Sequence, residues 1–206
     1  MCQPCRRHRC WQGWHCAGAN KGVAGVKGRA VNKALFLDRD GTLVVDTHYL
    51  HNPEDVQLIP GVTEALSIAR DAGYLLFLFT NQSGIGRGYY LMEDVLACNR
   101  EMIHQLGFKE DPFLETCIAP ESPDEMEIYR KPSPKFLLEM LEKHDLDPDS
   151  SWMVGDKLCD VEAGVRAGIR SAYVLSGKDL DVKPQKFIEK NAIPVFEDLT
   201  GFVAQL

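Results

Sequence analysis

The sequence predicts an α/β fold, a three-layer sandwich in which helices cover both faces of a central parallel β-sheet. From Lys33 onward, short apolar segments alternate with segments whose apolar residues recur at helical spacing, an alternation typical of such folds. Residues 74–80 (YLLFLFT) form an apolar run too short for a typical helix, as expected for a central strand buried on both faces. Polar residues follow several of these strands, at the edge where such sheets bind ligands.

In the first half of this region, each predicted element follows from a local pattern. Residues 34–37 form a short apolar strand, and residues 61–72 begin after Pro60 with apolar residues at helical spacing. Residues 74–80 are the central strand described above. Met92–Leu106 is predicted to be a helix that ends at Gly107, because glycine is common just beyond the end of a helix.

The alternation continues to the C-terminus. Residues 116–119 predict a weaker strand, and residues 133–143 predict a helix that begins after Pro132. The remaining predictions are strands at residues 151–155 and 171–175, a short helix at 161–167, an edge strand at 193–196 and a last helical turn or two at 199–206. Because no clear insertion interrupts this pattern, we expect no large cap domain.

Composition and charge favour a cytoplasmic globular protein. The chain has 206 residues, of which 45% are hydrophobic and 26% charged, and no apolar run approaches the ~20 residues that span a bilayer. Its N-terminus has no apolar stretch that would serve as a secretory signal. The net charge is −7, and residues 1–33 hold seven of the 23 basic residues and no acidic one, so 16 basic residues face 30 acidic ones in the rest. This acidic body disfavours nucleic-acid binding, and we expect a monomer that contacts no membrane.

Residues 1–32 differ from the rest, and we expect them to be a disordered, basic, Cys-rich extension before a domain over residues 33–206. The odd total of seven cysteines and the lack of an export signal disfavour a disulfide framework. Two alternatives remain open. One is a transit peptide, although the segment has no serine. The other is a zinc knuckle, whose candidate ligands, at a spacing that fits no standard pairing, are Cys2, Cys5, His8, Cys10, His15 and Cys16.

Polar residues at four strand ends are the candidate functional residues, since parallel strands bring these ends to one edge of the sheet. Three carboxylates close together would repel one another and raise their pKa values, and a divalent cation removes that cost. A small number of hard oxygen ligands suits Mg²⁺. In chain order the candidates are Asp38 and Asp40, Thr80 and Asn81, Arg130 and Lys131, and Asp156 with Asp160.

Such a group of residues suits phosphoryl transfer. One carboxylate beside a bound phosphate can attack phosphorus as a nucleophile. A second, two residues later, can protonate the leaving oxygen and then take a proton from water. Lys131 and the hydroxyl of Thr80 would complement the other phosphate oxygens. The expected partner is therefore a small phosphorylated metabolite.

Four motifs, in this order, resemble those of the haloacid dehalogenase (HAD) superfamily, and the resemblance covers about residues 33–180. The motifs are Asp38-Arg39-Asp40-Gly41-Thr42, Thr80 at a strand end, Lys131 before a helix, and Gly155-Asp156 after a strand. More narrowly, DRDGTL, TNQSGIGRG, RKPSP and VGDKLCD look like segments of the small, cap-less phosphatases that act on D-glycero-D-manno-heptose 1,7-bisphosphate or on histidinol phosphate. The resemblance implies a HAD-like Rossmannoid fold and a hydrolase of carbohydrate metabolism.

The resemblance also implies roles for individual residues. Asp38 would be the nucleophile that forms an aspartyl-phosphate, and Asp40 would be the general acid/base. Thr80 and Lys131 would hold the transferred phosphoryl group, and Arg130 would contribute to substrate recognition. The implied Mg²⁺ ligands are Asp38, Asp40 through its main-chain carbonyl, and Asp156. The residues implied to face the substrate are Asp46, Thr47, His48, Tyr49, Asn81, Gln82 and Ser83.

One segment departs from the pattern of these relatives. They often carry a zinc loop of the form Cys-x-His followed by Cys-x-Cys directly before Arg-Lys-Pro. Here Cys117 matches the first ligand, whereas the other three positions hold Ala119, Glu127 and Tyr129. Because one soft ligand cannot build a tetrahedral zinc site, we predict no zinc in the loop from Cys117 to Tyr129.

Simpler structural interpretations of the same residues remain open. Without the other motifs, Asp38 and Asp40 would suit a solvated turn, and Arg130 with Lys131 a pair of surface charges. Asp156 alone would suit a helix N-cap. Asp160 is either a support for metal-bound water or an exposed helical acid.

The glycines and the remaining cysteines carry weaker signals. Gly84, Gly86 and Gly88 have G-x-G-x-G spacing, which is not the dinucleotide-binding fingerprint and predicts instead a flexible loop beside a phosphate. Cys98, Cys117 and Cys159 are expected to be buried or incidental thiols.

The leading hypothesis is a Mg²⁺-dependent phosphatase that removes the 7-phosphate of D-glycero-D-manno-heptose 1,7-bisphosphate through an aspartyl-phosphate. Histidinol-phosphate phosphatase is the alternative within the same chemistry. A polynucleotide 3′-phosphatase would need a basic groove that an acidic body does not suggest. A non-catalytic phosphate-binding protein on the same fold would not need the acid pair of Asp38 and Asp40.

Overall fold

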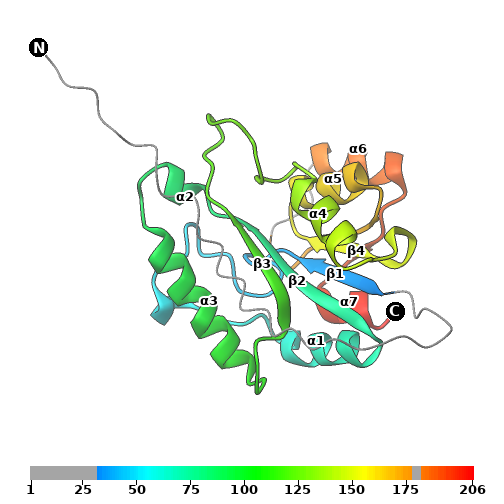
Figure 1. Cartoon of the computed structure of the whole chain (residues 1–206), viewed down its shortest axis with the longest axis horizontal. Helices are drawn as coiled ribbons and strands as arrows, with labels where there is room; N and C mark the ends of the chain where they lie inside the picture. Colours follow the sequence, from blue (N-terminus) through cyan, green and yellow to red (C-terminus); the bar gives the residue numbers. More distant parts are fainter. Residues whose placement is uncertain (1–31, 178–181) are drawn as a thin grey trace, which may run out of the picture. The chain divides into compact units, whose positions relative to one another are not determined.

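The structure, a computed structural model, describes residues 32–177 and 182–206 and contains a six-stranded sheet in the order β3-β2-β1-β4-β5-β6 (Figure 1). Every pair of neighbouring strands is parallel. The strands are β1 Lys33–Leu37, β2 Tyr74–Asn81, β3 Phe113–Ala119, β4 Trp152–Gly155, β5 Arg170–Val174 and β6 Val195–Phe196.

Helices cover both faces of this sheet. Helices α1, α3 and α7 pack on one face and α4, α5 and α6 on the other, which gives the three layers that the sequence predicts (Figure 1). Short 3₁₀ helices lie at Pro53–Asp55 and Pro148–Ser150. The helices are α1 Val62–Asp71, α2 Ser83–Gly86, α3 Met92–Leu106, α4 Lys135–Lys143, α5 Leu158–Ala167, α6 Val182–Asn191 and α7 Leu199–Val203.

The central strand β1 shows why the sheet needs cover on both faces. Leu35 and Leu37 belong to the apolar cluster beneath α1, α3 and α7, whereas Phe36 belongs to the cluster beneath α4 and α5. The ring of Phe36 stacks on that of Phe77 in β2, with centroids 4.7 Å apart, and Phe136 of α4 closes over both. Successive side chains of a strand point to opposite faces, so an unbroken apolar run is what a strand between two helical layers requires.

Most of the predicted elements are present with small differences at their ends. Helix α3 is confirmed over its whole predicted length, and Gly107 ends it with a left-handed φ of 70°. Strand β3 begins three residues earlier than predicted, at Phe113, because its first residues pair with β2. Helix α4 begins at Lys135 rather than at residue 133, since the amide of Ser133 closes a turn onto the carbonyl of Arg130 at 2.9 Å.

Two helices were not expected from the sequence. The segment of α6 (VKPQKFIEKN) is polar and contains a proline near its start, so its few apolar residues give a weak helical pattern. The flexible loop predicted at Gly84, Gly86 and Gly88 is wrong for the first two glycines, which lie in the single turn of α2. The carbonyl of Gly84 accepts a hydrogen bond from the amide of Tyr89, and this contact folds the segment back on itself.

The strand order places a ligand-binding edge beside β1. The chain runs from β1 outward to β2 and β3, and then returns to the other side of β1 to build β4, β5 and β6. Ligands bind at the carboxyl ends of the strands where the direction of strand addition reverses. The loops that follow β1, β2 and β4 therefore surround the candidate site.

The N-terminal prediction lies outside the described residues, apart from Asn32, whose backbone forms a bridge with Leu146. The boundary of the predicted domain at residue 33 stays a prediction. Within residues 32–177 and 182–206, no helix combines the length and the apolar character needed to cross a bilayer.

Candidate functional site

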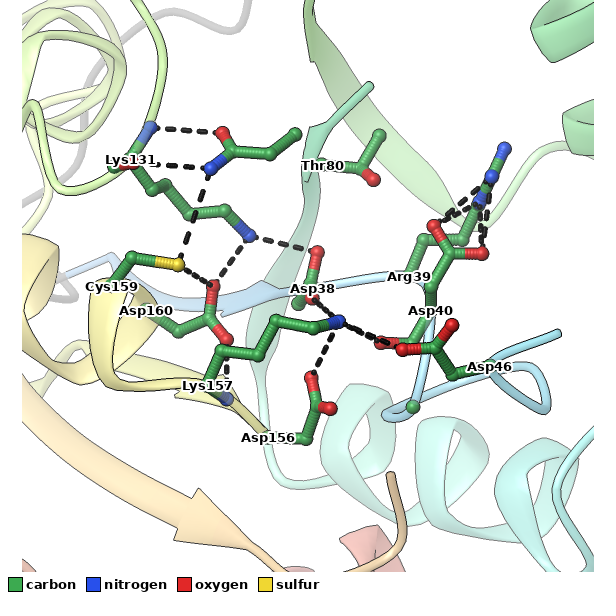
Figure 2. Close-up of polar contacts among 12 residues, drawn as sticks. Asp38, Arg39, Asp40, Asp46, Thr80, Lys131, Asp156, Lys157, Cys159 and Asp160 are labelled. Atoms are coloured by element: carbon green, nitrogen blue, oxygen red, sulfur yellow. Dashed lines mark hydrogen bonds and ion pairs between the residues drawn. The ribbon is translucent and has the colours of Figure 1, made fainter. Parts of the chain in front are cut away.

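Three buried carboxylates from two strand ends lie together at the carboxyl edge of the sheet. Asp38 follows β1, and its amide donates a hydrogen bond to the carbonyl of Val154 in β4 at 3.0 Å, which ties the two strand ends together. Asp156 follows β4, and Asp160 lies in the first turn of α5. Each of the three offers a carboxylate oxygen, and these oxygens lie within 4.8 Å of one another (Figure 2).

Lys131 faces this cluster from the loop before α4. Its Nζ lies 2.8 Å from Oδ1 of Asp38 and 2.7 Å from Oδ1 of Asp160 (Figure 2). The same Nζ lies 2.7 Å from the carbonyl oxygen of Phe79. Burial acts to lower the pKa of Lys131, but the carboxylates of Asp160 and Asp38 outweigh it and raise that pKa. Lys131 is buried and charged, so the surface-pair interpretation is wrong for this residue.

Asn81, at the end of β2, holds the backbone of Lys131 in place. Its carboxamide accepts a hydrogen bond from the amide of Lys131 at 2.9 Å and donates one to the carbonyl of the same residue at 3.1 Å. Asn81 is predicted to face the substrate. The structure gives its side chain an additional role, because its two hydrogen bonds fix the backbone position of Lys131.

Asp160 is fully buried, which excludes its interpretation as an exposed helical acid. Its Oδ2 accepts the amide hydrogen of Lys157 at 2.9 Å at the start of α5, and its Oδ1 pairs with Lys131. Burial raises the pKa of this carboxyl despite the neighbouring ammonium groups. Both oxygens are therefore engaged by the protein, and Asp160 supports Lys131.

The ammonium group of Lys157 lies among the oxygens of four acidic residues (Figure 2). Its Nζ is 3.1 Å from the main-chain oxygen of Asp40, 3.2 Å from Oδ2 of Asp46, 3.3 Å from Oδ1 of Asp156 and 3.9 Å from Oδ2 of Asp38. Burial acts to lower the pKa of Lys157, and these carboxylates raise it above its ordinary value. Sequence reasoning missed this residue, although it directly follows Asp156 in the motif VGDKLCD.

Asp156 is the carboxylate whose charge is least compensated. Burial, followed by the charge of Asp38, raises the pKa of Asp156 to about 8. Among the described residues neither of its oxygens has a hydrogen-bond partner, and its ion pair with Lys157 is long. A buried carboxylate left in this state suits a bound cation, and the oxygen donors around it are those that Mg²⁺ prefers.

Two glycines hold the backbone close to Asp156. Gly41 has a φ of 87°, and a methyl group there would lie 2.6 Å from Cγ of Asp156 and 2.8 Å from Cα of Gly177. A methyl group on Gly177 would meet the same carboxyl group and the Cα of Gly41. The carboxylate thus lies in a cradle that is open only because neither position has a side chain.

Asp40 presents its carbonyl and its carboxylate to different partners. The carbonyl accepts from Lys157, whereas the carboxylate receives the guanidinium of Arg39, with Nη2 at 3.0 Å from Oδ2, and the amide of Gln82 at 2.8 Å. Burial of the Arg39 side chain is almost complete, and Asn99 accepts a further hydrogen bond from it. Thr80, also buried, receives a hydrogen bond on its Oγ1 from Gln82 at 2.9 Å.

A hollow of about 210 Å³ opens beside these groups. Most of the residues predicted to face the substrate line it, together with Leu50, Tyr90 and Lys157, which were not predicted. Thr47 is exposed and does not line it, and the guanidinium of Arg130 donates to the carbonyl of Glu121 at 3.2 Å. The predicted residues in the lining are Asp40, Asp46, His48, Tyr49, Asn81, Gln82 and Ser83.

A larger open groove of about 580 Å³ lies elsewhere, between the start of α1 and the end of α3. Its lining is mostly apolar and includes none of the residues predicted for catalysis or binding. The chemistry that the carboxylates and ammonium groups suggest therefore belongs to the smaller hollow.

Side-chain burial and hydrogen bonds hold the segment from Cys117 to Tyr129 in place. Cys117 is buried, and burial raises the pKa of its thiol. The hydroxyl of Tyr129 donates to the carboxylate of Glu139, and Oε1 of Glu121 accepts the amide hydrogens of Ile128 and Tyr129 at 3.2 and 2.8 Å. In the described part of the chain, the cluster of Asp38, Asp156 and Asp160 is the one group of three or more potential metal-ligating side chains.

Comparison with known proteins places this geometry in context. A family model described as HAD-hydrolase-like matches residues 128–202. The chain is 37% identical over 148 residues to the D-glycero-beta-D-manno-heptose-1,7-bisphosphate 7-phosphatase of Helicobacter pylori, covering 70% of this chain and 84% of that protein. It is 34% identical over 187 residues to the D-glycero-D-manno-heptose-1,7-bisphosphate 7-phosphatase of Chlorobaculum tepidum, covering 83% and 94%.

Solved structures agree with these relatives. The D,D-heptose 1,7-bisphosphate phosphatase of B. bronchiseptica, complexed with magnesium and phosphate, matches with a TM-score of 0.73 and 27% identity over 84% of this chain and 97% of that one. The enzyme of the same name from Burkholderia thailandensis matches with a TM-score of 0.55 and 28% identity over the same shares.

Proposed function

This chain belongs to the D-glycero-D-manno-heptose-1,7-bisphosphate 7-phosphatases, which are HAD-like phosphoric monoester hydrolases, and from this we propose how its own residues hydrolyse the 7-phosphate of a heptose 1,7-bisphosphate. The observation that carries the proposal is the meeting of Asp38, Asp156 and the main-chain oxygen of Asp40 around one point, with Lys131 facing it.

Asp38 is the proposed nucleophile. Burial alone would raise its pKa, but the ammonium groups of Lys131 and Lys157 outweigh burial and lower that pKa, so the carboxylate is ionised at neutral pH. One oxygen contacts Lys131, and the other lies on the side of Lys157. An ionised carboxylate held between two cations can attack phosphorus to form an aspartyl-phosphate, and water then hydrolyses it.

Asp40 is the proposed general acid and base. It would protonate the oxygen that leaves phosphorus in the first step and take a proton from the attacking water in the second. Thr80 and Lys131 are proposed to hold the transferred phosphoryl group, since Lys131 contacts the nucleophile and Thr80 lies at the end of β2, the strand next to β1. Arg130 is proposed to contribute to recognition of the rest of the substrate.

Mg²⁺ is the proposed cofactor, held by Asp38, by the main-chain oxygen of Asp40 and by Asp156. The ion would neutralise charge on the phosphate oxygens when bound. The support for this comes from the oxygens of buried Asp156, which lack a hydrogen-bond partner, and from the magnesium in the B. bronchiseptica structure. Lys157 lies among the same oxygens, so its ammonium group has to shift aside when the ion binds.

The remaining parts of the proposal concern the surroundings of the enzyme. The substrate is a small phosphorylated sugar, and the residues that line the hollow with Asp46 and Tyr49 face it. We place the enzyme in the cytoplasm as a monomer that binds neither nucleic acid nor a membrane. The acidic balance of residues 34–206 disfavours nucleic-acid binding.

The test is phosphate release from heptose 1,7-bisphosphate, histidinol phosphate and other esters, with Mg²⁺ and with EDTA. We expect the highest kcat/KM for the heptose ester, loss of activity in EDTA, and a fall of at least about 10³-fold in Asp38→Asn, as for loss of a nucleophile. Asp149→Asn, an exposed aspartate in a 3₁₀ helix, is the matched control and should keep wild-type activity. Activity unchanged by EDTA and by Asp38→Asn would overturn the mechanism. Binding of the esters without hydrolysis of any of them would favour a phosphate-binding protein.

A further inference from the structure

A chain of buried side chains connects Tyr90 to the carboxylate of Asp40. The hydroxyl of Tyr90 donates to Oε1 of Gln82 at 2.9 Å. On the other side of the same carboxamide, Nε2 donates to Oδ2 of Asp40 at 2.8 Å and to Oγ1 of Thr80 at 2.9 Å. Gln82 and Tyr90 are buried, so these contacts form away from bulk water.

The hydrogen-bonding capacity of the groups fixes the direction of this chain. Oδ2 of Asp40 already accepts hydrogen bonds from the guanidinium of Arg39, so the NH₂ group of Gln82 faces this oxygen and the carboxamide oxygen faces Tyr90. Burial raises the pKa of Tyr90 to about 12, and the phenol therefore keeps its proton and remains a donor. The tyrosine hydroxyl thus holds the carboxamide in the one orientation that serves Asp40.

The local structure holds the Tyr90 ring in place. Gly84 lies directly against it, and a methyl group at Gly84 would overlap the ring carbons. On another side the ring stacks on His51, with centroids 5.4 Å apart and planes 3° from parallel. The ring is therefore fixed by packing as well as by its hydroxyl, and replacing Tyr90 with phenylalanine should leave the ring where it is.

Arg39 also holds Asp40, but in a different way. Its guanidinium contacts both oxygens of Asp40 at 3.0 to 3.3 Å and supplies charge. Gln82 is neutral and contacts one oxygen only, so it contributes to the orientation of the Asp40 carboxylate and not to its charge balance. Together the two donors determine how the carboxylate is oriented when a substrate arrives.

We propose that Tyr90 is a positioning residue, which acts through Gln82 on the direction of the Asp40 carboxylate and, to a smaller degree, on the hydroxyl of Thr80. The inference rests on the proposed function, since it takes Asp40 as the general acid. A small displacement of a proton donor lowers the rate because proton transfer requires hydrogen-bond contact with the leaving oxygen. Nothing in the sequence motifs assigns Tyr90 such a role.

Leaving groups of different basicity provide the test. The alkoxide that leaves from heptose 1,7-bisphosphate needs a proton, whereas the p-nitrophenolate that leaves from p-nitrophenyl phosphate does not. In Tyr90→Phe we expect kcat/KM for the heptose ester to fall about tenfold, a part of the ~10²–10⁴-fold that a positioned acid supplies. The fall for p-nitrophenyl phosphate should be about twofold, from the contact to Thr80. Equal losses with the two esters, or no loss with either, would overturn the proposal.

Coupling between the two side chains gives a second test. If Tyr90 acts through Gln82, the double variant Gln82→Ala/Tyr90→Phe should lose no more activity than Gln82→Ala alone, and additive losses would contradict the inference. Tyr74→Phe removes the hydroxyl of another buried tyrosine at the far end of β2, and it should change neither rate. Activity that survives Asp38→Asn would instead refute the proposed function, whatever Tyr90 does.

Discussion

At the scale of single residues, the site brings several carboxylates together, and two ammonium groups offset the repulsion between them. Asp38 is flanked by Lys131 and Lys157, and Asp160 is paired with Lys131. Neither oxygen of Asp156 has a hydrogen-bond partner among the described residues, and burial, followed by the charge of Asp38, raises the pKa of this carboxyl to about 8. The pH dependence of metal binding should therefore report on this residue.

The stability of the metal-free protein should fall as the pH rises from about 4 to about 8 because of Asp156. In this window the unfolded chain has lost the proton that the folded chain retains, so the free energy of unfolding decreases with pH. Mg²⁺ binds the deprotonated carboxylate and should restore stability most where the proton is already lost. We expect Mg²⁺ to raise Tm by several degrees more near pH 8.5 than near pH 6, as measured by calorimetry.

The control for this prediction is Asp156→Asn, which removes the charge and keeps the shape of the side chain. In this variant both the pH dependence and the Mg²⁺-induced rise in Tm should shrink. The lowered pKa of Asp38 has the opposite effect on the free energy of unfolding, which falls as the pH drops below about 4. This lies outside the pH range of the experiment. A rise in Tm that is the same at both pH values would contradict the assignment of Asp156 as the titrating ligand.

At the scale of elements, one glutamate connects the two ends of the loop between β3 and α4. The carboxylate of Glu121 holds two amides on the far side of the loop, and its carbonyl accepts from Arg130. We expect Glu121→Ala to raise KM for the heptose ester about three- to tenfold with a smaller change in kcat, because the loop would no longer fix the guanidinium. Glu127→Ala, at an exposed position of the same loop, should leave both constants unchanged. An equal and large fall in kcat would show that Glu121 acts on the reacting groups instead.

The end of α3 offers a test of backbone conformation. Gly107 ends this helix with a left-handed φ and has open space around it, so Gly107→Ala should cost about 1 kcal/mol through backbone strain alone. Gly201 lies in α7 with ordinary clearance, and Gly201→Ala should be neutral or stabilising by up to about 1 kcal/mol. Urea unfolding would measure both changes, and a Gly107→Ala variant as stable as wild type would contradict this account of the helix end.

The features of the site that strand topology determines could be predicted from the sequence, whereas those that depend on side-chain conformations could not. Parallel strands alone put Asp38 and Asp156 on the same edge of the sheet, and the two residues meet because β1 and β4 are neighbours. The partners of Asp40 do not follow, since they depend on the rotamers of Arg39 and Gln82. The position of Lys157 likewise results from tertiary packing that sequence spacing does not determine.

At the scale of the whole molecule, we predict that the enzyme needs magnesium and does not need zinc. Zinc-selective chelation should leave Tm and activity unchanged, and elemental analysis of the purified protein should find no stoichiometric zinc. EDTA should remove activity, and Mg²⁺ should restore it. A stoichiometric zinc ion, or activity that only zinc restores, would show that the loop from Cys117 to Tyr129 or the N-terminal cysteines bind metal after all.

The strand order also has a consequence for the way the protein is made. Strand β1 leaves the ribosome early, but its neighbour β4 begins only at Trp152, so one side of β1 waits on the order of ten seconds for its partner during synthesis. Until then the growing chain exposes an unpaired apolar strand edge, which is prone to aggregation. A truncated transcript that stops before β4 would therefore yield an insoluble and inactive fragment rather than half an enzyme.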